Sequence, residues 1–252
     1  MKATPLYNRR ALHLPGGDAV IVADLHIGIE YDLSLTGANI PSQTASLASR
    51  CTGLCEDHDA TTLYIAGDLK HMIAASGDST EHARMMRQER WDLRMFVQSL
   101  SSCAMKLVKG NHDGGLRSSP TLTVHDSGGI CIGDVAIAHG HAWPSDEVMQ
   151  GELLVMGHVH PVVRLRDDLG FSTSKPCWLR APLLEDAAVE RYPDVNLELE
   201  VVVMPAFNPL CGGMAVNTEG ILGPMHGIVD VDAAEVYLLD GTRLGSVASL
   251  RL

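Results

Sequence analysis

Several side chains that commonly ligate divalent metals come directly after short apolar runs of this chain. The first run, residues 19–23, ends in Asp24-Leu-His26, and four later runs end in the same manner. Apolar runs of this length are typical of buried strands, and functional groups of layered α/β folds gather just beyond the carboxyl ends of such strands. The sequence therefore predicts a metal site at one sheet edge. Its candidate ligands are Asp24, His26, Asp68, Asn111, His139, His158 and His160.

The types of these side chains indicate which metals they would hold. Asp24 and His26 supply one oxygen and one imidazole, and the carboxylate of Asp68 has two oxygens with which to bridge two cations. Asn111 adds a neutral carbonyl oxygen. Mixed nitrogen and oxygen ligands favour Mn²⁺, Fe, Zn²⁺, Co²⁺ or Ni²⁺ over Ca²⁺ or Mg²⁺ alone, with Mn²⁺ the first choice. Two such cations about 3.5 Å apart can activate water for in-line attack on a phosphoryl group.

Composition indicates a globular protein without a broadly basic surface. The 252 residues are 46% hydrophobic and 20% charged, and 19 basic against 31 acidic residues give a net charge of −12. This charge argues against extensive nucleic-acid contact, although a local basic patch stays compatible with it. No signal-peptide or membrane-span pattern is present, and the six cysteines lack paired metal spacing. We expect reduced thiols in a cytoplasmic protein that does not enter membranes.

The elements that must position the ligands can be read from periodicity and turn signals. Helices are predicted over residues 42–56, with Ser42 as N-cap, and 80–101, and residues 27–41 are predicted as a loop. Asp240-Gly241 predicts a C-terminal hairpin, whose edge could pair in a homodimer. Helices early and strands late indicate two facing sheets with helices outside, in a single domain of residues 1–252. Short strands are predicted at 61–66, 104–109, 121–125, 129–132, 134–139, 152–157 and 197–203.

The order of the motifs resembles the calcineurin-like metallophosphoesterase superfamily. The motifs are Asp24-Leu-His26, Gly67-Asp68, Gly110-Asn-His-Asp113, His139-Gly-His141 and Gly157-His-Val-His160. Longer strings resemble the small archaeal and bacterial phosphoesterases whose bacterial members are encoded beside a DNA ligase and a helicase. These strings are Gly67-Asp-Leu-Lys-His71, His158-Val-His-Pro161, Lys175-Pro-Cys-Trp-Leu179 and Met204-Pro-Ala-Phe-Asn-Pro-Leu-Cys-Gly-Gly213.

The resemblance implies a four-layer αββα sandwich of two mixed sheets, a dinuclear metal site and a role in DNA repair. By the same resemblance, His112 would protonate the leaving oxygen or stabilise the transition state, and Asp113 would orient His112 through its ring N–H. The first metal would be held by Asp24, His26 and His160, the second by Asn111, His139 and His158, with Asp68 bridging them.

Other polar residues leave alternatives open. His139 or His141 could be the ligand; the motif order favours His139, with His141 lining the pocket. His71 could contact substrate or pack behind the metals, and Asn208 could cap a turn or support the site. A stripe of arginines, including Arg84 and Arg87, is either a solvated face or a phosphate contact. The stripe is completed by Arg90 and Arg94, and its acidic neighbours are Glu81, Glu89 and Asp92.

The leading functional hypothesis is a dinuclear metal-dependent phosphodiesterase that acts on DNA or RNA. One alternative is a phosphodiesterase or phosphatase for a small nucleotide or phosphoester, which the acidic net charge favours. Another is a metal-stabilised scaffold that binds a partner without catalysis, against which the presence of both His112 and Asp113 argues. Lys70 and His71 stand where protein phosphatases carry Asp-Arg-Gly, which argues against protein phosphatase activity.

Overall fold

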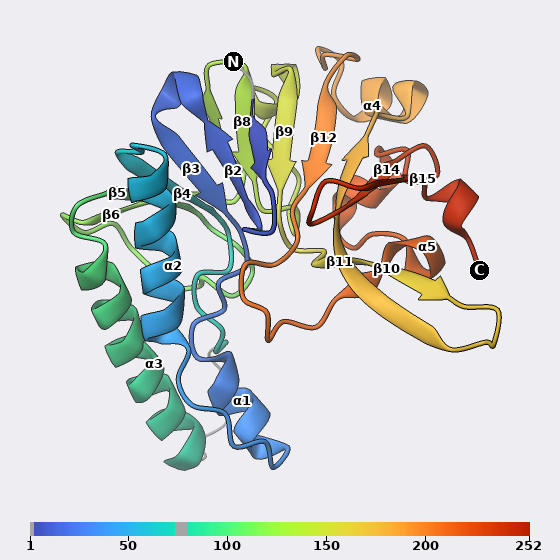
Figure 1. Cartoon of the computed structure of the whole chain (residues 1–252). Helices are drawn as coiled ribbons and strands as arrows, with labels where there is room; N and C mark the ends of the chain where they lie inside the picture. The colour runs from blue at the N-terminus through green and yellow to red at the C-terminus, as the bar shows by residue number, and fades with distance from the viewer. Residues whose placement is uncertain (1–2, 74–79) are drawn as a thin grey trace.

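Two β-sheets face each other in the computed structural model, which describes residues 3–73 and 80–252 (Figure 1). The first sheet has six strands in the order β1-β2-β3-β4-β5-β6. Its first three strands are antiparallel and the remaining pairs are parallel, so the sheet is mixed. The strands are β1 (Thr4–Leu6), β2 (Ala11–Leu14), β3 (Ala19–Val22), β4 (Thr62–Ala66), β5 (Ala104–Val108) and β6 (Leu122–His125).

The second sheet has nine strands and is also mixed. Seven follow the order β13-β10-β11-β12-β9-β8-β7, and β14 pairs with β11 and β15. The predicted C-terminal hairpin is confirmed as β14 and β15. The strands are β7 (Ile130–Ile132), β8 (Val135–Ala138), β9 (Leu153–Met156), β10 (Pro161–Arg166), β11 (Ser172–Ala181), β12 (Glu200–Val203), β13 (Met214–Ala215), β14 (Glu235–Leu238) and β15 (Arg243–Ser246).

Helices cover the outer faces of the two sheets, which confirms the predicted αββα layers (Figure 1). α2 (Thr44–Asp57) and α3 (Thr80–Ser99) lie on the first sheet, whereas α4 (Glu185–Arg191) and α5 (Val216–Glu219) accompany the second. The predicted loop 27–41 contains a helix, α1 (Ile29–Leu35), which its periodicity did not reveal. α2 begins one residue after Gln43, so Ser42 is not its N-cap.

Apolar side chains fill three layers. Between the sheets, residues such as Ile21 of β3 and Val155 of β9 are fully buried. Between the first sheet and its helices, Leu47, Cys51 and Leu54 of α2 recur at three- and four-residue spacing, as expected for an amphipathic helix. A third cluster lies around α4, α5 and the second sheet. In the described ranges, no helix has the length and apolarity needed to cross a membrane.

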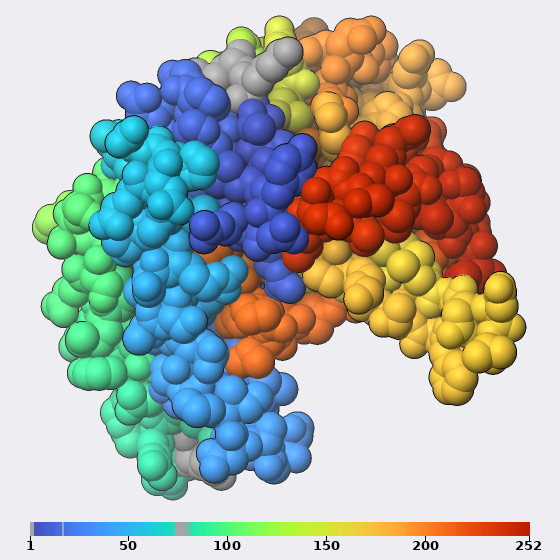
Figure 2. All heavy atoms as spheres, viewed as in Figure 1, coloured from blue at the N-terminus to red at the C-terminus, as the bar shows by residue number. Residues whose placement is uncertain are grey.

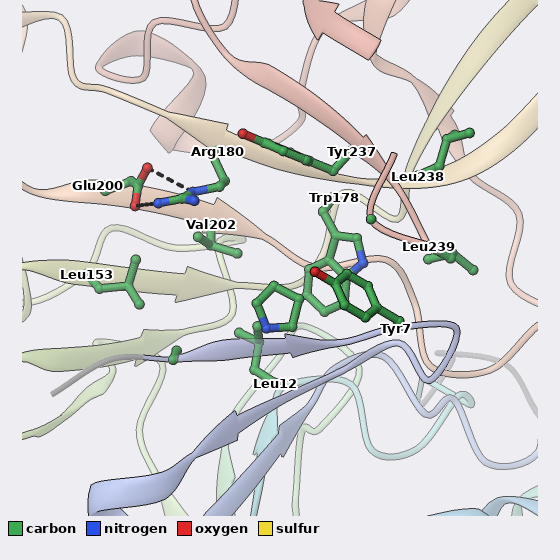
Figure 3. A pocket seen from close by; sticks show the side chains of 13 residues that line it. Tyr7, Leu12, Leu153, Trp178, Arg180, Glu200, Val202, Tyr237, Leu238 and Leu239 are labelled. Atoms are coloured by element: carbon green, nitrogen blue, oxygen red, sulfur yellow. Dashed lines mark hydrogen bonds and ion pairs between the residues drawn. The ribbon is translucent and has the colours of Figure 1, made fainter. Parts of the chain in front are cut away.

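A mostly apolar cavity of about 230 Å³ lies between β1, β2 and the second sheet (Figure 3). Trp178 and Tyr7 approach each other across it, and Arg180 forms an ion pair with Glu200 at its rim. None of the candidate metal ligands lines this cavity. It is therefore separate from the site described below.

Candidate metal centre

The loops after β3, β4, β5, β8 and β9 bring all seven candidate ligands together. The Asp68 carboxylate lies at the middle: its Oδ2 is 3.6 Å from Nε2 of His26 and 3.2 Å from Nε2 of His139. On one side, Asp24, His26 and Asp68 place ligand atoms within 4.8 Å of one another. On the other, Asp68, His139 and His158 do the same. Asp68 belongs to both groups, which is the position a bridging ligand needs.

The remaining two ligands complete these groups. Nε2 of His160 lies 3.3 Å from Oδ1 of Asp24 and 3.3 Å from Nε2 of His26. The Oδ1 atom of Asn111 lies 3.3 Å from Nε2 of His139. The structure thus gathers four imidazoles, two carboxylates and one amide around two adjacent positions. This donor set fits two transition-type divalent cations.

Backbone carbonyls fix which imidazole nitrogen faces the centre. Nδ1 of His139 lies 2.8 Å from the carbonyl oxygen of Ala66, and Nδ1 of His160 lies 3.0 Å from that of Gly212. Each Nδ1 must carry a proton to donate to its carbonyl. The Nε2 lone pair is then left for a metal, as in other histidine metal sites.

The chain at the centre adopts an unusual backbone conformation. Five candidate ligands have φ between 43° and 71°, a left-handed region in which only glycine is free of steric cost. Gly157 precedes one of them, and a Cβ there would lie 2.8 Å from Oδ2 of Asp24, so only glycine lets the backbone approach this carboxylate so closely. Sharp reversals directly after the strands turn successive side chains to one point. The five are Asp24, His26, Asp68, His158 and His160.

Burial and neighbouring charges shift the pKa values of the ligand side chains when no cation is bound. Burial opposes ionisation of Asp68, but His139, His26 and the His112 amide outweigh it and hold the Asp68 pKa well below its usual range. Burial lowers the pKa of His26 to about 3 and that of His158 to about 4. For His139, burial favours the neutral ring, yet the facing carboxylates raise its pKa to about 9. A proton on His139 therefore compensates charge that cations would neutralise instead.

His112 faces the centre without belonging to either ligand group of Asp68. Its backbone N–H donates to Oδ1 of Asp68 at 2.9 Å, and its ring Nδ1 donates to the carbonyl of His71. The other ring nitrogen lies 4.0 Å from Oδ2 of Asp68. Its side chain is one-fifth exposed and lines a cavity of about 310 Å³. This nitrogen is placed to reach a group bound over the centre.

The expected role of Asp113 is wrong. Its carboxylate is fully buried and accepts four backbone N–H groups, whereas the His112 ring is oriented by the carbonyl of His71. From the sequence, a carboxylate directly after His112 looks suited to accept the N–H of the His112 ring. In the structure it turns away from that ring and accepts the backbone amides of the neighbouring loop instead. Those four amides belong to Asp68, Leu69, Lys70 and Gly110. Asp113 therefore shapes the loop that carries Asp68.

His71 lies between the centre and α1. Its Nδ1 is 3.2 Å from Nδ1 of His26, and its Nε2 is 3.6 Å from a carboxylate oxygen of Asp32. Its backbone N–H donates to Glu89 of α3 at 2.9 Å, and the N–H of Met72 donates to the same oxygen. His71 thus lines the cavity and contacts His26, and its contact with substrate stays a prediction.

The arginine stripe of α3 does not reach the centre. Arg84 and Arg87 are exposed on the side of the helix away from Glu89, which contacts the His71 loop. Glu89 and Asp92 were expected beside the arginines, but each is only 2% exposed and faces inward. Their three-residue spacing, in register with buried Leu93 and Phe96, is the signal that could have revealed this. Arg84 and Arg87 do not line this cavity, and their contact with a phosphate backbone stays a prediction.

Two further residues complete the picture of the site. The His141 ring lies 5.2 Å from the His139 ring and 6.1 Å from the His158 ring, so it borders the second ligand group while His139 contacts Asp68. Cys211, from a loop after β12, also lines the cavity; it lies in the string Met204–Gly213, but no role at the site was predicted for it. Figure 2 shows the hollow between α1 and the β10–β11 hairpin, with the orange surface of the loop after β12 beside it.

Comparison with known proteins identifies the fold. No protein-family model matches the chain, and no curated protein sequence is significantly similar to it. The structure is similar to that of the nuclease MPE of Pseudomonas putida, with a TM-score of 0.59 and 22% identity over 95% of this chain and 98% of that one. A predicted phosphoesterase of Streptococcus pneumoniae matches at 10% identity over 89% of this chain and 91% of that one. Its TM-score of 0.31 is too low to support a structural conclusion. With its two mixed sheets and flanking helices, the chain has the α/β metallophosphoesterase fold that its motifs predict.

Proposed function

We propose that this chain is a dinuclear metal-dependent phosphodiesterase that hydrolyses phosphoester bonds with water. The observation that carries the proposal is the position of Asp68, whose carboxylate is shared by two groups of ligand atoms beneath a cavity. Bound there, two divalent cations would supply positive charge for the phosphoryl oxygens and an activated water nucleophile. The fold shared with a nuclease supports the same reaction class.

The residues of the chain have distinct tasks in this reaction. The carbonyl groups of Ala66 and Gly212 hold the rings of His139 and His160 in one tautomer, which keeps the Nε2 atom of each ring directed at the centre. The free ring nitrogen of His112 faces the cavity, where it would donate a proton to the leaving oxygen or hydrogen-bond to the phosphoryl group. The carbonyl of His71 holds the Nδ1 atom of His112, so the ring is already oriented before substrate binds. Its Nε2 atom therefore faces the cavity without a further loss of side-chain rotational entropy on binding.

The substrate that we propose is a nucleic acid, cleaved by a nuclease activity. The similar Pseudomonas putida structure is named a nuclease, and a cavity of about 310 Å³ lies over the candidate ligands. A DNA-repair role belongs to this proposal through the motif resemblance alone. A second candidate is a small nucleotide or phosphodiester. The exposed Arg84 and Arg87 do not line the cavity, which favours a substrate small enough to need no contact with them.

Parallel hydrolysis assays test both candidates. Protein loaded with Mn²⁺ is given bis-p-nitrophenyl phosphate, p-nitrophenyl phosphate and labelled single-stranded DNA, with His112→Ala for comparison. His58→Ala is a matched control because His58 caps the end of α2 next to the start of β4, at the opposite edge of the sheet. Cleavage of the diester and the DNA, lost only in His112→Ala, supports the nuclease. Diester hydrolysis with intact DNA supports the second candidate, and no hydrolysis despite bound metal refutes both.

A further inference from the structure

Cys211 lies closer to the metal centre than its place in the sequence suggests. Its Sγ atom and the ligand nitrogens of His26 and His160 are all within 4.8 Å of one another. The same sulfur lies 3.8 Å from the backbone carbonyl oxygen of Asp24. Of the cysteines in the part of the chain that the structure describes, only Cys211 belongs to such a group; Cys51 and Cys177, for instance, are buried in apolar layers.

The loop that carries Cys211 is tied to the loop that carries the ligands. Asn208 is fully buried, and its amide NH₂ donates to the carbonyl of Leu25 at 2.9 Å. Its Oδ1 accepts the N–H of Leu210 at 3.0 Å, and the Cys211 N–H donates to the Asn208 carbonyl at 3.2 Å. Asn208 thus both builds the turn and supports the site. These hydrogen bonds hold the loop of Cys211 against the Asp24–His26 segment.

The spacing is close to what one cation requires. A zinc ion binds thiolate sulfur at about 2.3 Å and imidazole nitrogen at about 2.0–2.1 Å, so two such ligands are at most about 4.4 Å apart. The sulfur and the two nitrogens lie within 4.8 Å of one another, a range that includes such separations. Coordination would break the S–H bond, form a metal–sulfur bond and release one proton to solvent.

We propose that Cys211 ligates the first metal together with Asp24, His26 and His160, which makes this position selective for a thiophilic ion. The inference rests on the proposed dinuclear function and deepens it. The second position, formed by Asn111, His139 and His158 with Asp68, offers only nitrogen and oxygen. Since thiolate favours Zn²⁺ and disfavours Mn²⁺, the two positions should differ in metal preference. The centre would then be chemically asymmetric.

X-ray absorption at the zinc edge tests this directly, without an activity assay. Full-length protein is loaded with one equivalent of Zn²⁺, which should fill the thiophilic position first. We expect one sulfur at about 2.3 Å in the wild type, and only nitrogen and oxygen in Cys211→Ser. Cys131→Ser is the matched control, because Cys131 is also partly buried but lies on β7 and contacts Glu147. That variant should retain the sulfur signal.

Competition between metals gives a second readout. Cys211→Ser should lower the affinity for Zn²⁺ relative to Mn²⁺ by about tenfold or more, with circular dichroism confirming that the variant is folded. Zinc bound only by nitrogen and oxygen in the wild type would overturn the role of Cys211 and leave the proposed function intact. A wild-type protein that binds neither Zn²⁺ nor Mn²⁺ would refute the metal centre itself.

Discussion

The carboxylate of Asp113 offers the sharpest test of the site architecture. Its Oδ2 accepts the N–H groups of Asp68 and Gly110, both at 2.8 Å, and its Oδ1 accepts those of Leu69 and Lys70 at 3.0 and 3.3 Å. Asp113→Asn keeps the shape but replaces one acceptor oxygen with an NH₂ donor. Two buried amides then lose their acceptor and face another donor.

The size of the effect follows from those two amides. A buried amide left without a partner costs about 1–3 kcal/mol, so Asp113→Asn should lower the free energy of unfolding by about 2–6 kcal/mol. For a urea dependence of about 3 kcal/mol/M, the midpoint would move by about 0.7 M or more. The control is Asp126→Asn, whose side chain is 97% exposed and which should change stability by less than about 0.5 kcal/mol.

The assay is urea unfolding of metal-free protein, since bound metal would add its own stabilisation. Asp113→Asn protein with the wild-type midpoint would refute the structural role assigned to this carboxylate. If the variant kept the wild-type midpoint but lost hydrolysis after metal loading, Asp113 would act on the reaction and not on stability. That outcome would restore the role in orienting His112 that the sequence suggested.

Three further perturbations follow from the geometry. His112→Ala should retain two metals by elemental analysis and lose about 10²- to 10⁴-fold in kcat for diester hydrolysis; unchanged kcat would remove this ring from the reaction. Gly110→Ala places a methyl group 2.1 Å from Oδ1 of Asp68 and should weaken metal binding in calorimetry, whereas Gly114→Ala meets nothing within 4 Å and should bind normally. In metal-free protein, burial lowers the pKa of His26 to about 3, while the unfolded ring titrates near 6.5. The unfolded chain therefore binds more protons between these values, so this contribution to stability should fall as pH drops from 6.5 to 3, and His26→Gln should flatten that part of the urea profile.

Much of the site was predictable because strand ends carry its ligands. Buried runs such as β3 and β4 are readable from composition, and their carboxyl ends must meet when the strands are parallel. The role of Asp113 was not predictable, because which donors surround a carboxylate depends on how the loop folds back. Cys211 was missed for a related reason: its loop lies 51 residues after His160 and reaches the centre only through the fold.

The arginine helix shows a different limit. Charge spacing on α3 correctly placed Arg84 and Arg87 on one exposed face, but it also led us to expect Glu89 outside. A carboxylate becomes buried when unpaired amides, here those of His71 and Met72, offer it hydrogen bonds. Periodicity shows which face of a helix is apolar; it does not show which polar residue the neighbouring loop needs.

The distribution of ligands along the chain has a consequence for how the protein matures. Asp24 and Asp68 follow strands of the first sheet, whereas His139 and His158 follow strands of the second. Neither sheet alone holds a complete set, so the centre can form only after both have formed and docked. Such late, long-range assembly is intrinsically slow, and a chain still emerging from the ribosome could not yet capture a cation pair. Metal uptake would then mark the completion of folding, and metal loss would precede separation of the sheets.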